Sequence, residues 1–216
     1  MAFAAYASSL KISGTAVVIT NEACTGLGGS QWQVTTAARR IIDPATAVVV
    51  KDTGVTVSAA LYSVNMLFGI ITFSGYTPTG AVTLTGAYLP LLTVAEVRSA
   101  DVSMETDMAD STTFDNAGYK GKTPTLDDWS GSFEFLSLPT VDLDGVAAGT
   151  QSITSWRESG TPKLLELKLS ATPHYWRGWG VFDAGSMKLG VGDLAVFTAS
   201  MKGASQGSGT GWAIGT

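Results

Sequence analysis

Histidine, cysteine and charge are scarce in this chain of 216 residues. It has one histidine, His174, and one cysteine, Cys24. A single cysteine excludes an internal disulfide framework, and these two residues are too few for a metal site built from several thiolates or imidazoles. Charged residues make up 14% of the sequence, below the usual share of about 25%. Because hydrophobic residues make up 45%, the composition excludes a disordered chain and favours a folded one with a weakly charged surface.

The stretch from Thr53 to Ala95 has no charged residue, which raises the question of a membrane span. Thr, Ser and Gly interrupt it every few positions, and Pro78 and Pro90 lie inside it, whereas a spanning helix requires about 20 predominantly apolar residues in a row. Residues 1–14 have no basic start followed by a continuous apolar stretch, so no signal peptide is predicted. We therefore expect neither a membrane segment nor a membrane partner.

Apolar residues alternate with small polar residues through much of the chain. Val55 and Val57 flank Thr56, and Val82 and Leu84 flank a threonine in the same way. Such alternation places the apolar side chains on one face of a strand. It predicts strands over 46–50, 55–58, 70–74, 81–88, 96–106, 129–136, 163–170, 174–183, 186–191 and 194–202.

Turn residues separate the predicted strands, among them 51–54 and 190–193, and the second of these is typical of a hairpin. One helix is predicted over 150–159, where Ile153 and Trp156 share a face. The sequence therefore predicts an all-β sandwich or barrel with one short flanking helix.

Acidic residues gather in the second half of the chain. Between Asp101 and Asp144 there are ten acidic residues and two basic ones, Lys120 and Lys122. A segment of this charge repels the phosphate backbone, which argues against sequence-specific contacts with nucleic acid. A solvated acidic loop without a partner is the alternative interpretation.

Candidate catalytic and metal-binding residues are few. A Ser–His pair would have to use His174, whose aromatic neighbours Tyr175 and Trp176 favour packing or an interface. Asp142 and Asp144 resemble part of a calcium loop, but the third oxygen ligand and the later glutamate of such a loop are missing. A β-turn is the preferred interpretation there. The residue inventory predicts no enzyme, no metal and no cofactor.

One stretch carries a family resemblance: Asp107-Met-Ala-Asp-Ser-Thr-Thr-Phe114, then Gly118-Tyr119-Lys120, then Thr125 to Phe133. A strand that ends near Thr106 leads into a long polar loop, and the chain re-enters the sheet at Trp129. This order resembles the major tail proteins of siphoviruses, the long-tailed bacteriophages, in which a similar strand and loop lead into a Trp-Ser-Gly strand.

The resemblance divides the chain into segments. It covers residues 1–20 and 93–205, which are expected to form a β-sandwich core of the tail tube type. Residues 21–92 are expected to form an inserted β subdomain, with a single continuous sandwich as the alternative. Residues 206–216 are rich in Gly and Ser and are expected to form a flexible tail.

The resemblance also implies a function, that of a structural tail tube subunit. Such subunits assemble into stacked, six-fold rings, and phage DNA passes through the lumen without adhering. The expected partners are further copies of the chain and other tail proteins: the tape measure, the tail terminator and the tail tip. The expected location is the virion tail, assembled in the cytoplasm of the host bacterium.

The loop over 107–128 is the expected contact with an adjacent subunit, because aromatic residues in an otherwise polar segment often anchor interfaces. For Trp129 an ordinary core position is the alternative. The candidate contact residues are Asp107, Asp110, Phe114, Tyr119, Lys120, Asp127, Asp128 and Trp129.

A carbohydrate- or receptor-binding β module, of a phage tail tip or a capsid decoration, is the alternative function. The chain has six tryptophans, and Trp176 and Trp179 lie close enough in sequence to supply stacking platforms for sugars. Against this, aromatic residues fall on both strand faces over 175–179, as in a buried sheet.

Overall fold

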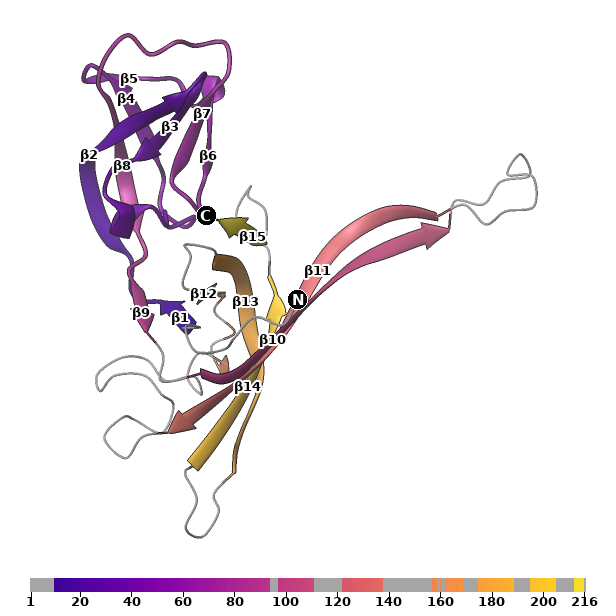
Figure 1. Ribbon diagram of the computed structural model, residues 1–216. Coiled ribbons are helices and arrows are strands. Elements are labelled where there is room, and N and C mark those ends of the chain that lie inside the picture. Colours follow the sequence, from indigo (N-terminus) through magenta and orange to yellow (C-terminus); the bar gives the residue numbers. More distant parts are fainter. Residues whose placement is uncertain are drawn as a thin grey trace, which may run out of the picture. The chain divides into compact units, whose positions relative to one another are not determined.

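The computed structural model describes residues 10–93, 97–110, 122–137, 157–158, 160, 162–168, 175–188, 195–204 and 212–215. These residues form antiparallel sheets, which confirms the predicted all-β fold (Figure 1). They divide into two compact units, which are described separately. The first comprises Met1–Val94, Lys163–Gly178 and Ser205–Thr216, and the second Ala95–Pro162 and Trp179–Ala204.

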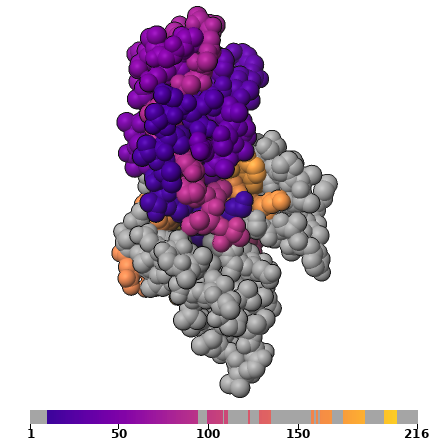
Figure 2. All heavy atoms as spheres, turned by 90° about the vertical axis from the view of Figure 1, so that its left-hand side faces the viewer, coloured from indigo at the N-terminus to yellow at the C-terminus, as the bar shows by residue number. Residues whose placement is uncertain are grey.

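The first unit contains a seven-stranded sheet. In spatial order its strands are β5 (Val55–Thr56), β4 (Val49–Asp52), β8 (Val82–Tyr88), β2 (Val17–Gly28), β3 (Gln31–Val34), β7 (Ile70–Phe73) and β6 (Tyr62–Asn65). Two 3-10 turns, η2 (Ala37–Arg39) and η3 (Ala59–Leu61), lie between strands. In the space-filling view, residues 10–93 form a continuous, closely packed surface (Figure 2). The core beneath consists of Ile19, Val34, Ile42, Val50, Val57, Ile71, Phe73, Val82 and Leu84.

Strand β2 connects the two halves of this sheet. Its first part pairs with β8 and its last part, from Cys24 to Gly28, pairs with β3. The register shifts between Ile19 and Glu22, and Asn21 between them has a φ of 50°, a conformation that Asn tolerates better than most residues. Such a bulge bends a strand, and β2 passes from β8 to β3 shortly after it, between Ala23 and Cys24.

The sequence predicted no strand at β2. The bulge interrupts the alternation of apolar and polar residues, and Val18 has 75% of its surface exposed. Cys24 lies on the same strand and is half-buried. Burial, together with the nearby charge of Glu22, raises the pKa of the Cys24 thiol to about 12.

The predicted turn over 51–54 is confirmed as the hairpin between β4 and β5. Thr53 and Gly54 both have positive φ angles, of 48° and 84°. Two successive positive φ angles define the type I′ turn, whose twist matches that of the strands it connects.

The carboxylate of Asp52 fixes the loop that faces this hairpin. Oδ2 accepts hydrogen bonds from Thr79 N at 2.7 Å, Tyr76 Oη at 2.9 Å and Thr79 Oγ1 at 3.0 Å, and Oδ1 accepts one from Gly80 N at 3.0 Å. Asp52 is buried, and these bonds, led by that from the Thr79 backbone, hold its pKa below the usual 3.8. A single acidic side chain thus organises residues 76–80.

The remaining strands of the first unit are β9 (Leu91–Thr93), β1 (Leu10–Ser13), β12 (Lys163–Lys168), residues 175–178 of β13 (Tyr175–Lys188), and β15 (Trp212–Gly215). Strand β1 pairs with β9 on one side and β12 on the other. Ser13 Oγ accepts a hydrogen bond from Leu164 N at 3.0 Å. The buried apolar side chains here are Leu10, Ile12, Leu164, Leu165 and Leu167.

The second unit is built from β10 (Val97–Asp110), β11 (Lys122–Ser137), β14 (Ala195–Gly203) and residues 179–188 of β13, in that order. Strand β13 is one strand where the sequence predicted two, over 174–183 and 186–191. A register shift between Phe182 and Ala184 marks a bulge, which interrupts the alternation without ending the strand.

Several other predictions fall partly or wholly outside the described residues. These include the hairpin turn at 190–193 and the predicted helix over 150–159, of which Arg157 and Glu158 are described and are helical. The boundaries of the inserted subdomain over 21–92 are not tested by the two units and stay a prediction. Among the described residues, no helix is long and apolar enough to cross a membrane.

We expect Asp52→Asn to lower the free energy of unfolding at neutral pH, because an amide cannot accept all four hydrogen bonds. A carboxyl whose pKa is lower in the folded state stabilises the fold above its unfolded pKa, and this contribution disappears as the pH falls through the folded pKa. The difference between the two proteins should therefore shrink below about pH 4. Urea unfolding over a pH series measures it, and a difference that stays constant would contradict this role of Asp52.

Candidate functional site

Among the described strands, none lies beside the outer part of the hairpin formed by β10 and β11. Strand β11 pairs with β14 from Ser130 to Ser137, and with β10 from Lys122 to Phe135. Before Ser130, β11 therefore has a neighbour on one side, and β10 ends the strand order of the sheet. We call residues 104–110 and 122–128 the arm. In Figure 1 its two strands run together beyond the end of β14.

The arm has no buried face among the residues whose side chains are described. On β10, Ser103 to Asp107 are all exposed, as are Ala109 and Asp110, and Met104 exposes 46% of its surface. A two-stranded hairpin without a covered apolar face is at best marginally stable in water. No described strand pairs with its outer edges, and a strand edge of this kind can accept a strand of another chain. Both properties fit a segment that is covered by another molecule.

The arm is acidic. The acidic residues Asp107 and Asp110 lie on β10, and Asp127 and Asp128 lie on β11. Glu105 lies directly opposite Asp128 in the register, and both are exposed, whereas Asp110 lies opposite Lys122. Like charges directly opposite each other destabilise a strand pair. The arm therefore has a local charge that favours a basic partner.

Trp129 lies at the base of the arm, where β14 begins to pair with β11. Its surface is 3% exposed, and its Nε1–H donates a hydrogen bond to Trp179 O at 3.0 Å. The indole lies against two glycines of neighbouring strands. A Cβ on Gly180 would lie 2.7 Å from Trp129 Cζ2, and a Cβ on Gly203 would lie 2.8 Å from Cδ1. These strands thus need glycine where the ring approaches the backbone.

The structure changes the interpretation of the predicted contact residues. The expected loop over 107–128 is wrong at both ends, because 107–110 and 122–128 are paired strand residues. The sequence of these residues has no alternation of apolar and polar side chains, so it predicted no strand there. For Trp129, the burial of the side chain agrees with the alternative interpretation, an ordinary core position. Phe114, Tyr119 and Lys120 lie outside the described residues, and an inter-subunit role for the whole set stays a prediction.

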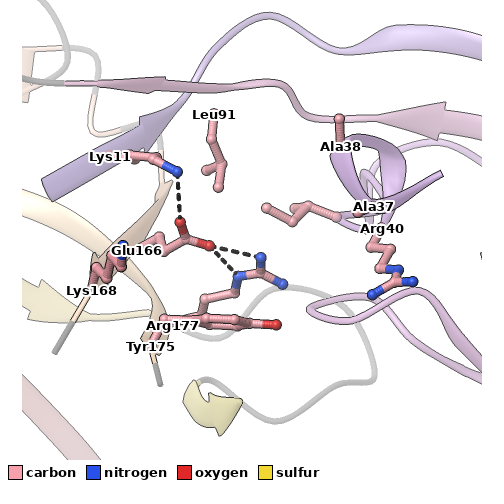
Figure 3. A pocket seen from close by; sticks show the side chains of 10 residues that line it. Lys11, Ala37, Ala38, Arg40, Leu91, Glu166, Lys168, Tyr175 and Arg177 are labelled. Atoms are coloured by element: carbon pink, nitrogen blue, oxygen red, sulfur yellow. Dashed lines mark hydrogen bonds and ion pairs between the residues drawn. The ribbon is translucent and has the colours of Figure 1, made fainter. Parts of the chain in front are cut away.

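A second candidate site lies in the first unit, around a buried ion pair (Figure 3). The side chains of Glu166 on β12 and Arg177 on β13 are each 8% exposed, with 2.7 Å between Glu166 Oε2 and Arg177 Nη2. Arg177 Nε donates to the same oxygen at 2.8 Å, and its Nη1 donates to Leu67 O. The guanidinium also lies over the rings of Phe68 and Tyr175, 5.3 and 4.4 Å from their centroids.

This ion pair forms part of the wall of a surface cavity of about 590 Å³. Lys11 Nζ reaches the second oxygen of Glu166 at 3.3 Å. Ala37, Arg40, Leu91 and Lys168 also line the cavity, with Lys168 on the side of Glu166 and Arg40 on the opposite side (Figure 3). Figure 3 shows Lys11 and Arg177 converging on Glu166 from different strands.

Sequence reasoning did not identify Glu166 or Arg177. A signal was present, because each is a charged residue within a run of apolar or aromatic strand residues, Leu-Leu-Glu-Leu and Tyr-Trp-Arg-Gly-Trp. A charge in a strand of that kind requires a partner when it is buried. The partner itself is not evident from the sequence, because the two residues are on different strands.

The described residues offer little for acid–base or metal chemistry. They contain no group of three or more His, Cys, Asp or Glu side chains placed to hold a metal ion. His174, and the pair Asp142 and Asp144, lie outside the residues that the structure describes. Within the described part of the chain, the two sites with distinctive geometry are the acidic arm and the basic cavity.

No protein-family model and no curated protein sequence matches the chain. Among solved structures, it is similar to a chain in the tail of an empty GTA particle, refined with helical methods and C6 symmetry. The sequences are 13% identical and the TM-score is 0.44, over 58% of this chain and 85% of that chain. It is also similar to a chain in the virion of a native gene transfer agent (GTA) particle, with 12% identity and a TM-score of 0.44, over 58% and 89%. At these values the function has to be argued from the chain's own residues.

We expect Trp129→Ala to lower the free energy of unfolding by about 3–5 kcal/mol, since it removes a large buried ring and leaves a cavity. Trp129→Phe retains a ring but removes the bond to Trp179 O, and should cost less. Urea unfolding followed by far-UV circular dichroism measures both. Equal and small effects would show that the arm does not depend on this anchor.

We expect Glu166→Gln to cost about 3–5 kcal/mol, because it leaves the buried Arg177 without its anionic partner. The double variant Glu166→Gln with Arg177→Met should recover part of the loss, since the unpaired charge is then gone. Thermal unfolding of the two single variants and the double variant measures the coupling. Additive effects would contradict a direct pair.

Proposed function

We propose that this chain is a structural subunit of a phage-type virion tail, the tail tube subunit, which assembles with copies of itself into stacked rings. The observation that carries the proposal is the arm, an extended strand pair without a core of its own. The resemblance of residues 107–133 to siphovirus major tail proteins points to the same role. The proposal includes six subunits in each ring.

The arm supports self-assembly through its outer edges, beside which no described strand lies. A free strand edge acts as a template for another chain, and natural proteins cover, interrupt or pair such edges. Strand β10 ends the sheet and has fourteen residues, longer than typical edge strands of about 5–6 residues. Head-to-tail contacts close into rings when the rotation between subunits closes, and they continue as a stack when it does not. A tube requires contacts of both kinds.

The net charge of −5 fits a conduit for DNA. Acidic side chains facing a lumen release no counterions when DNA passes, so the DNA slides without adhering. In this proposal the chain also contacts the tape measure, the tail terminator and the tail tip. It is assembled in the cytoplasm of the host bacterium, is not an enzyme, and is found in the virion tail.

The domain organisation belongs to the same proposal. Residues 1–20 and 93–205 form the tail-tube core, and residues 21–92 are an insertion. The flexible tail expected over 206–216 does not include residues 212–215, because these form strand β15 and pair with β13. The seven-stranded sheet supports the insertion, because all of its strands come from Val17 to Tyr88.

The alternative of a carbohydrate-binding module is less well supported. Trp176 and Trp179 were its candidate stacking platforms, and they are buried, with 2% and 4% of their surfaces exposed. A sugar ring stacks on an exposed aromatic face, and neither residue presents one.

Shortening the arm tests the proposal. Thr106 and Asp127 are direct partners in the register, so residues 107–126 can be replaced by Asn-Gly, which favours a two-residue hairpin turn. Trp129 and its surroundings are retained. We expect the full-length chain to form rings or uniform tubes in electron micrographs, and the shortened chain to remain a folded monomer.

Thr53→Asn is a matched control, because it introduces the same turn sequence into the hairpin between β4 and β5. It should assemble like the full-length chain. Normal tubes from the shortened chain would show that the arm is not an assembly element. A full-length chain that stays monomeric at high concentration and binds glycans would favour the alternative function.

A further inference from the structure

The cavity of the first unit has an excess of positive charge. Four basic residues line it, Lys11, Arg40, Lys168 and Arg177, and they face one acidic residue, Glu166. Glu166 is engaged by Arg177 and by Lys11. One carboxylate therefore lies among four cations, in a surface cavity that solvent reaches.

The cavity retains donors that the fold does not use. Lys168, at the end of β12, has no hydrogen bond or ion pair within the described part of the chain, and it is partly exposed. Arg40 is held by one bond, from its Nε to Val34 O at 3.0 Å, and its two Nη groups have no partner among the described residues. Lys168 and Arg40 lie on opposite sides of the cavity (Figure 3), and each offers a cationic group to which a carboxylate can bind.

The arm supplies carboxylates that the fold does not neutralise. Glu105 and Asp128 are direct neighbours across the two strands, and both are exposed. Asp128 Oδ1 accepts a hydrogen bond from Trp129 N at 2.7 Å, and this bond leaves its other oxygen available. Bringing a cation to this pair would relieve its repulsion.

We propose that the basic cavity of one subunit receives the Glu105 and Asp128 carboxylates from the arm of a second copy. This inference rests on the proposed function and specifies the contact that the arm makes. The charges are complementary, and the arm extends from its own sheet without a supporting face. An ion contact of this kind sets partner and register, and it weakens as salt is added.

Charge reversal tests the contact. Lys168→Glu should raise the critical concentration for tube assembly about tenfold, and Glu105→Lys should do the same. The double variant, with both changes in one chain, restores opposite charges and should assemble within about threefold of the original protein. Lys51→Glu is the matched control: it makes the same charge change in the first unit, outside the cavity, and should have little effect. Circular dichroism verifies that every variant folds.

Cross-linking tests whether the partner is a second copy. One preparation carries Glu105→Cys and another carries Lys168→Cys, and the two are mixed before a short bis-maleimide is added. We expect a covalent dimer from the mixture, and much less from either preparation alone or from the original protein. A cross-link within single chains of a Glu105→Cys, Lys168→Cys double variant, with none between chains, would overturn the proposal.

The outcomes separate this inference from the proposed function. If the original protein forms no rings or tubes, the proposed function fails. If it forms tubes and Lys168→Glu assembles like Lys51→Glu, the tube subunit stands and the cavity contact is wrong. The inference is also overturned if the original protein binds duplex DNA and Lys168→Glu abolishes that binding without affecting assembly.

Discussion

The requirement that every backbone N–H and C=O find a partner governs this chain more than any single side-chain contact. Each strand in the middle of a sheet meets it on both sides, and its side chains are then free to build a core. The backbone groups of β11 have a neighbouring strand on both sides only from Ser130 onward, where β14 lies beside it. Before Ser130, β10 and β11 pair only with each other among the described strands, and the proposed role of the arm in assembly follows from this.

Trp129 lies where the part of β11 with two neighbouring strands meets the part with one. From Ser130 to Phe135, β11 lies between β10 and β14, and glycines of neighbouring strands make room for the indole. From Lys122 to Asp128, β11 has β10 as its one neighbour among the described strands. A buried aromatic ring at the base of an extended hairpin fixes the direction in which the hairpin leaves the sheet, because the ring cannot turn without losing its bond to Trp179. Interface anchoring and core packing, considered as alternatives for this residue, are therefore compatible: the ring packs inside its subunit and so positions the arm.

Much of the fold could be predicted from the sequence, because strand alternation and turn residues are local signals. The strands near 70–74 and 81–88 and the turn at 51–54 follow directly from them. Strand β2 was missed since its bulge at Asn21 shifts the alternation. The two halves of β13 were separated for a similar reason, and the arm strands were predicted as loop because they have no apolar face. Glu166 and Arg177 were missed because pairing between distant strands leaves no local pattern.

The state of Cys24 has a consequence for the durability of an assembled particle. Burial raises the pKa of its thiol to about 12, so the thiol is protonated at neutral pH, whereas the thiolate is the form that reacts with oxidants and disulfides. It is the one cysteine of the chain. In the proposed tube, Cys24 is therefore poorly suited to form disulfide bridges between neighbouring subunits.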